Sequence, residues 1–150
     1  MIELVIQERV WSLNKSFNIS RGAKTTADTL QVHLLKDGER GLGECVPYSR
    51  YGETIDSVKN QIVKLKSDIE SEKIDLNNLS SYLKPGAARN VIDCAFWDLK
   101  CKSEKRNIWS LLGEEMPNTI QSCYTIVLNT PDKMIDDTKE HVNFPMLKVK

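Results

Sequence analysis

The sequence predicts an α+β fold, in which an antiparallel sheet comes first, helices follow, and one strand–helix–strand unit comes last. Three observations predict this order. Apolar residues alternate in the first part of the chain, an apolar stripe of helical spacing starts at Ile55, and a helix opened by Pro131 lies between two apolar strands. A change of the apolar period from 2 to 3.6 residues separates strands from helices.

The first part of the chain predicts a three-stranded antiparallel meander. Leu4 and Ile6 begin the first strand, and Asp37 with Gly38 supplies a tight turn between the second and third. The second strand spans residues 29–35 and carries three apolar residues on one face (Leu30, Val32, Leu34). The third spans residues 41–45, where two glycines indicate a bulge or a close approach of another backbone.

Helices are predicted next. Thr54 is the expected N-cap of a helix with an apolar stripe (Ile55, Val58, Ile62, Leu65, Ile69). A short helix over residues 76–83 is expected to be capped by Asp75. A longer one spans residues 87–102, and a last one, residues 108–112, ends at Gly113 as a C′ glycine would end it.

Pro117 marks the next boundary. The segments after it read as a strand over residues 120–128, a helix opened by Thr130 and Pro131, and a strand over residues 145–150. This is one βαβ unit. Because parallel strands normally need cover on both faces, the chain is expected to be incomplete as a fold.

Bulk composition excludes several functions. With 21 basic and 21 acidic residues the net charge is zero, so no nucleic-acid partner is expected. The four cysteines form no Cys-x-x-Cys pair, which argues against zinc, and Cys94 and Cys101 are expected to be small buried residues of one helix. No signal peptide or membrane span is recognised, so we expect a cytoplasmic protein with no membrane partner.

The segment that ends at Lys150 carries the strongest chemical signal. Lys148 and Lys150 are two positions apart in a predicted strand, so they share a face and lie roughly 6.6 Å apart along it. Two close ammonium groups repel, which lowers the pKa of at least one and makes a base at neutral pH. A solvated basic end of the chain is the alternative interpretation.

Five segments, in order, resemble the enolase superfamily in its muconate-lactonising branch, and the dipeptide epimerases in particular. They are residues 17–22 (FNISRG), 41–53 (GLGECVPYSRYGE), 86–99 (GAARNVIDCAFWDL), 124–127 (YTIV) and 147–150 (LKVK). The resemblance implies a capping domain, residues 1–116, followed by the first β-α-β of a (β/α)7β TIM-like barrel, residues 117–150. Active sites of such barrels lie at the C-terminal ends of the strands.

The resemblance implies an isomerase that moves a proton at the carbon next to a carboxylate, here the α-carbon of the C-terminal residue of a dipeptide of the L-Ala-D/L-Glu type. Lys150 resembles one of two acid/base lysines, and Lys148 its electrostatic partner. Arg21 resembles a specificity-loop arginine that suits a distal carboxylate. Tyr51 resembles a residue of a covering loop, or a plain turn residue, and Thr125 a wall of the substrate pocket or a packed strand residue.

The same resemblance implies Mg²⁺, whose acidic ligands, like the second lysine, would come from strands beyond residue 150. We therefore expect the N-terminal part of an epimerase-like enzyme, inactive by itself. Alternatives are a sister activity (muconate cycloisomerase, o-succinylbenzoate synthase or N-acylamino acid racemase) or a non-catalytic capping fragment. Because exposed strand edges favour self-association, a homo-oligomer is a possible state.

Overall fold

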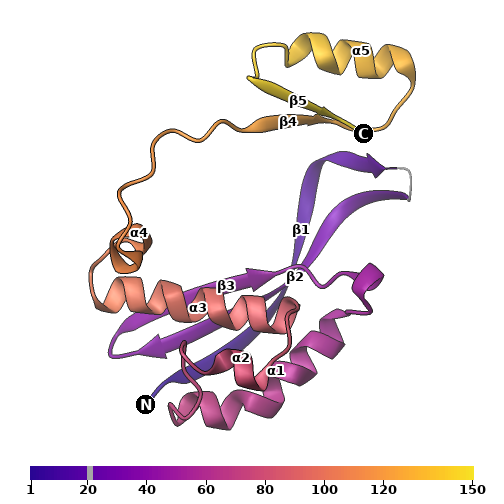
Figure 1. The fold of residues 1–150 in the computed structure, drawn as a ribbon. Helices are drawn as coiled ribbons and strands as arrows, with labels where there is room; N and C mark the ends of the chain where they lie inside the picture. The colour runs from indigo at the N-terminus through magenta and orange to yellow at the C-terminus, as the bar shows by residue number, and fades with distance from the viewer. Residues whose placement is uncertain (20–21) are drawn as a thin grey trace. The chain divides into compact units, whose positions relative to one another are not determined.

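The computed structural model describes residues 1–19 and 22–150, and its elements follow the predicted order (Figure 1). The strands are β1 (Glu3–Ile19), β2 (Gly22–Lys36), β3 (Glu39–Cys45), β4 (Cys123–Ile126) and β5 (Met146–Val149). The helices are η1 (Ser49–Tyr51), α1 (Ile55–Glu70), α2 (Leu79–Tyr82), α3 (Ala87–Ser103), α4 (Ile108–Leu112) and α5 (Pro131–Glu140). None of the described helices is both long and apolar enough to cross a membrane.

The chain forms two compact units, each with its own internal contacts. Unit 1 comprises residues 1–11 and 28–115, and unit 2 comprises residues 12–27 and 116–150. The long strands β1 and β2 therefore run through both units. Their inner parts belong to the sheet of unit 1, and their outer parts belong to unit 2.

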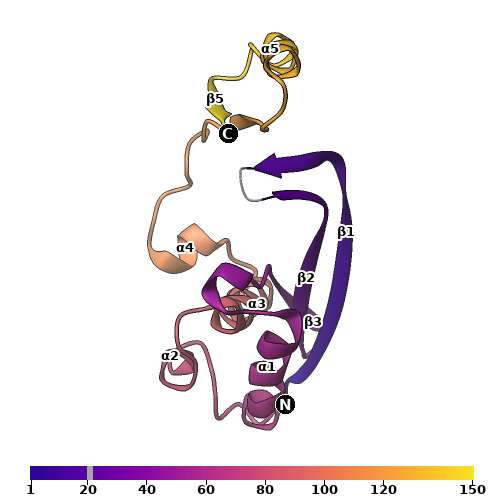
Figure 2. The same ribbon diagram turned by 90° about the vertical axis from the view of Figure 1, so that its right-hand side faces the viewer.

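Unit 1 is an antiparallel sheet in the order β1-β2-β3, covered on one face by α1 and α3 (Figure 2). The predicted α+β meander is thus confirmed. The register between β2 and β3 places Val32 opposite Gly43 and Leu34 opposite Gly41. The apolar side chains of β2 meet those of the two helices, and this core holds buried residues from every part of the unit (among them Leu4, Leu30, Val58, Ile62, Val91 and Ile92).

Two helix ends follow the predictions. The Thr54 hydroxyl accepts the N–H of Ser57 at 3.1 Å, and the Ser57 hydroxyl accepts the N–H of Thr54 at 2.9 Å, so two N–H groups that the helix itself cannot satisfy are paired. At the end of α4, Gly113 has φ of 73°, a left-handed conformation that costs glycine nothing.

Two local predictions were wrong. The cap of α2 is Asn78, because the Asp75 carboxylate turns the chain earlier by accepting the N–H groups of Asn77 and Asn78. Cys94 is exposed and Cys101 only half-buried, because the face of α3 that carries Val91 packs on the sheet and these two cysteines lie elsewhere on the helix.

Unit 2 contains a parallel pair of strands, β4 and β5, connected through α5. Thr130 precedes the helix and Pro131 opens it, as predicted. Both strands are shorter than predicted, four residues each. Much of this unit's apolar surface is exposed, including Ile120, Ile135, Val142, Met146 and Val149.

Candidate active site

The C-terminal edge of the β4–β5 pair gathers three of the predicted site residues. Thr125 lies opposite Lys148 in the parallel register. Neighbouring strands lie about 4.8 Å apart, so these two residues are adjacent. Lys150 stands one residue past β5, where its backbone N–H donates to the Ile126 carbonyl at 3.0 Å. Two lysines and a threonine therefore lie on neighbouring positions at one strand end.

Charge and exposure at this edge suit a binding surface. Lys148 and Lys150 are both exposed, whereas Thr125 is half-buried. Ile126, which lies opposite Val149 in the register, is almost fully buried. A cation pair held on a firm backbone can bind a carboxylate and can transfer protons.

Tyr51 belongs to unit 1 and ends the short helix η1. Its side chain is 77% exposed, and its ring lies 6.1 Å from that of Tyr48. The Tyr48 carbonyl accepts the N–H groups of Tyr51 and Glu53, which closes the turn. The Glu53 carboxylate then accepts the N–H of Ala87 at 2.7 Å, so this segment supplies the acceptor for the first N–H of α3.

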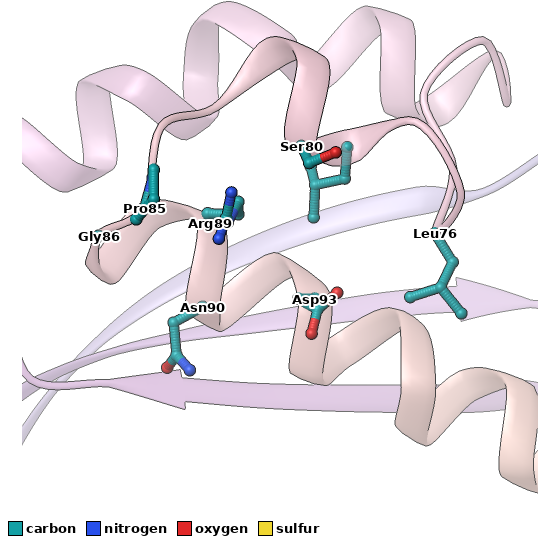
Figure 3. Close-up of a pocket in the computed structure, with 8 residues that line it drawn as sticks. Leu76, Ser80, Pro85, Gly86, Arg89, Asn90 and Asp93 are labelled. Carbon is teal, nitrogen blue, oxygen red and sulfur yellow. The ribbon is translucent and has the colours of Figure 1, made fainter. Parts of the chain in front are cut away.

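Arg21, the predicted distal-carboxylate residue, lies outside the described residues. Among the described site residues, the structure brings Thr125, Lys148 and Lys150 together, and it places Tyr51 in the other unit. A further hollow of about 360 Å³ lies in unit 1 between α2 and α3, and Ser80, Arg89 and Asp93 line it (Figure 3). None of the described candidate site residues lines that hollow.

One cluster that could hold a metal ion was not predicted. Within the described part of the chain, Asp137, Glu140 and His141 bring potential ligand atoms within 4.8 Å of one another. The spacing of Asp137 and His141, four apart on a helix, is the sequence signal that could have found it.

This cluster does not fit Mg²⁺. The Asp137 carboxylate accepts the Tyr124 hydroxyl at 3.2 Å and lies 3.6 Å from the Lys15 ammonium. Mg²⁺ prefers an octahedron of oxygen ligands. Here His141 would offer an imidazole nitrogen, and the Asp137 carboxylate is already paired with the Lys15 ammonium.

A family profile decides the wider identity. The profile of the mandelate racemase / muconate lactonizing enzyme N-terminal domain matches residues 1–113. The chain belongs to this family. Its three-stranded sheet with helices is accordingly the N-terminal capping domain of enolase-superfamily proteins.

Individual relatives in the family are epimerases and racemases. The chain is 37% identical over 145 residues to the L-Ala-D/L-Glu epimerase of Escherichia coli (strain K12), covering 95% of this chain and 45% of the relative. It is 36% identical over 111 residues to the N-acetyl-D-glutamate racemase of Pseudoalteromonas sp, covering 73% and 35%. The chain thus spans less than half the length of these relatives.

Solved structures of the family share the fold. An enolase family member from Agrobacterium tumefaciens with homology to dipeptide epimerases, solved with sodium and L-Ala-L-Glu, superposes with a TM-score of 0.92 at 36% identity, over 100% of this chain and 46% of that one. The dipeptide epimerase of Cytophaga hutchinsonii, complexed with Mg and D-Ala-L-Val, gives 0.86 at 25% identity, over 99% and 44%.

Proposed function

We propose that this chain is the N-terminal part of an isomerase that epimerises dipeptides of the L-Ala-D/L-Glu type at the α-carbon of the C-terminal residue. The observation that carries the proposal is the meeting of Thr125, Lys148 and Lys150 at the C-terminal edge of a parallel strand pair, in a chain of this family. The relatives that are epimerases and the neighbour solved with L-Ala-L-Glu support the substrate class.

Lys150 is the proposed acid/base residue. In its neutral form the amine removes the α-proton of the substrate on one face, and the ammonium returns it in the reverse direction. Lys148 supplies a positive charge beside it, which attracts the substrate carboxylate. Thr125 forms part of the pocket wall next to Lys148.

Arg21 and Tyr51 complete the proposal from the capping domain. A guanidinium fork suits the distal carboxylate of a glutamate residue, so Arg21 is the proposed specificity residue. Tyr51, exposed on its short helix, is the proposed covering residue.

The proposed fold continues beyond this chain. We propose that residues 1–116 form the capping domain and that residues 117–150 begin a (β/α)7β barrel. The parallel β4–β5 pair and the exposed apolar residues of unit 2 support this, because parallel strands normally have both faces covered. Mg²⁺, which would stabilise the negative charge that develops when the proton leaves, is proposed to bind residues outside this chain. A homo-oligomer and a cytoplasmic location stay predictions.

A racemase of N-acylated amino acids is the second candidate, favoured by the similarity to an N-acetyl-D-glutamate racemase. Both substrates carry an acylated α-nitrogen and a carboxylate next to the reacting carbon. They differ at the amino end, where a dipeptide adds an ammonium group. Rates for L-Ala-L-Glu and N-acetyl-L-Glu, measured side by side on the complete enzyme, distinguish the two.

The role of Lys150 is tested by hydrogen exchange on the complete enzyme in D₂O, followed by ¹H NMR of the substrate α-proton. If two bases act on opposite faces, Lys150→Met lowers the rate of epimerisation by a factor of about 10² or more. It also stops solvent exchange of one epimer while the other still exchanges. The control Lys139→Met, an exposed helix position, keeps both reactions.

The result would contradict the proposal if Lys150→Met still exchanged both epimers. The 150-residue chain alone, supplied with Mg²⁺, is expected to produce no L-Ala-D-Glu. Turnover by this chain would show that the described residues suffice for the chemistry.

A further inference from the structure

The outer parts of β1 and β2 form a hairpin arm that contacts residues of the segment 116–150. We call residues 12–19 and 22–27 the hairpin arm. Although each of its strands continues into the sheet of unit 1, the arm belongs to unit 2 together with residues 116–150. The arm therefore groups with residues 116–150 as well as continuing the pairing of β1 with β2.

Two contacts fasten the arm to the connection between β4 and α5. The Leu128 N–H donates to the Asn18 carbonyl at 3.2 Å. On the same side, the Lys15 ammonium lies 3.6 Å from an Asp137 carboxylate oxygen. Between them is a cavity of about 230 Å³, bordered by polar and charged residues of both segments (Lys15, Ser16, Asn18, Asn129, Lys133, Asp137).

Asp137 is itself held in place on α5. Its side chain is only 19% exposed, and it accepts the Tyr124 hydroxyl at 3.2 Å. The Tyr124 ring stacks on His141 with centroids 3.6 Å apart, which ties the helix to β4. Tyr124, Glu140 and Asp137 together raise the pKa of Lys15, so its ammonium form is favoured. The carboxylate is the more buried partner of the pair, and the Lys15 side chain is 65% exposed.

We propose that Lys15 and Asp137 are positioning residues, whose ion pair sets where the hairpin arm lies on the β4–α5 connection. This connection starts right after Ile126, whose carbonyl accepts the N–H of Lys150. The arm is thereby placed at the strand edge that carries Lys150, and its position shapes one border of the substrate site. This last consequence rests on the proposed function.

The contact is tested on the 150-residue chain by amide hydrogen exchange. Because water screens an ion pair whose lysine is exposed, Lys15→Met and Asp137→Asn are each expected to speed exchange of the Leu128 amide only about two- to fivefold. The double variant is expected to match the single ones, because both remove the same pair. Lys133→Met is the matched control: it removes a lysine from the same cavity, and no ion pair joins Lys133 to another described residue.

Salt supplies a measurement that needs no variant. At about 1 M salt the unmodified chain is expected to show the same faster Leu128 exchange, while amides of α3 keep their protection and report that the chain is folded. Leu128 exchange that is unchanged by Lys15→Met and by salt, or changed equally by Lys133→Met, would overturn the positioning role.

The catalytic consequence is measured separately on the complete enzyme. Lys15→Met is expected to raise KM for the dipeptide about two- to fivefold with kcat nearly unchanged, and Lys133→Met to change neither. If the enzyme epimerises no dipeptide, the proposed function fails while the exchange result still decides the contact. If KM is unmoved in an active enzyme whose Leu128 exchange did change, the positioning role in catalysis is wrong.

Discussion

His33 is the most unusual residue of the capping domain. It lies on the central strand β2, opposite Leu42 of β3, and is only 8% exposed. Neither ring nitrogen has a hydrogen-bond partner among the described residues. Burial lowers the pKa of His33, and the cations of Arg40 and Arg9 lower it further. Folding therefore favours the neutral form of the His33 imidazole.

This predicts a stability that depends on pH. Because the pKa of His33 is lower in the folded chain than its ordinary value of about 6.5, the unfolded chain binds a proton first as the pH falls. The free energy of unfolding should have its full value, as far as His33 is concerned, above about pH 6.5, and it should decrease as the pH falls below that. Urea denaturation of the 150-residue chain between about pH 5.5 and 7.5 measures the slope.

His33→Leu is the matched variant. It removes both unpaired nitrogens and the titrating group, so we expect a flatter slope and a stability at neutral pH equal to or above that of the unmodified chain. A steeper slope, or a loss of several kcal/mol at neutral pH, would mean that the imidazole has a favourable partner in the folded chain.

At the scale of elements, the close contact between β3 and α3 determines how the helix packs on the sheet of the capping domain. A Cβ built on Gly43 would overlap the backbone carbonyl of Val91, and one on Gly41 would overlap that of Ala95. The strand and the helix thus approach more closely than any side chain permits. Asp98 of the same helix accepts the N–H of Leu42 at 2.8 Å, so the register is fixed by a hydrogen bond as well.

Gly43→Ala is expected to destabilise unit 1 by about 1–3 kcal/mol or more, because the helix must move to admit one methyl group. Chemical denaturation followed by the helical circular dichroism signal measures this. Glu39→Ala, on the same strand, serves as the control and should change stability by less than about 1 kcal/mol. A Gly43→Ala chain as stable as the control would show that the helix can shift without cost.

At the scale of the whole molecule, the two units are unequal. All members of the main core cluster lie between Ile2 and Leu99, within unit 1. Unit 2 buries little, and many of its large apolar residues are exposed. Stability of the chain therefore comes mainly from the capping domain.

A chain that ends at Glu115 is accordingly predicted to fold. It retains the complete core of unit 1, so its unfolding free energy should match that of the 150-residue chain within about 1 kcal/mol. Circular dichroism with urea denaturation compares the two. Loss of a cooperative transition would show that residues 116–150 contribute to the core of the capping domain.

Features that depend on residues close together in the sequence were predicted better than features that depend on distant residues. The cap at Thr54 and the end at Gly113 were correctly predicted, because each depends on one residue and its nearest neighbours. The cap at Asp75 was not, because Asn78 competes for the same role within three positions. The exposure of Cys94 required knowing which face of α3 meets the sheet.

The candidate site shows the same limit. Strand periodicity predicted that Lys148 and Lys150 share a face, and the helix between two strands predicted a parallel pair. The register that places Thr125 opposite Lys148 came only from the structure. The pairing of Lys15 with Asp137 left no local pattern, since the two residues belong to segments at opposite ends of the chain. The roles of Arg21, Tyr51, Thr125, Lys148 and Lys150 stay predictions.

The hydrogen bond from Ala87 to Glu53 has a consequence for how substrate preference can diverge within the family. Glu53 holds its segment on α3, while Tyr51, two residues away, contributes nothing to the core. Tyr51, the proposed covering residue, is thus separate from the residue that holds the segment on α3. Randomised libraries at Tyr51 with Glu53 retained should keep most of their members folded, so the proposed covering role of Tyr51 can be varied without loss of the fold.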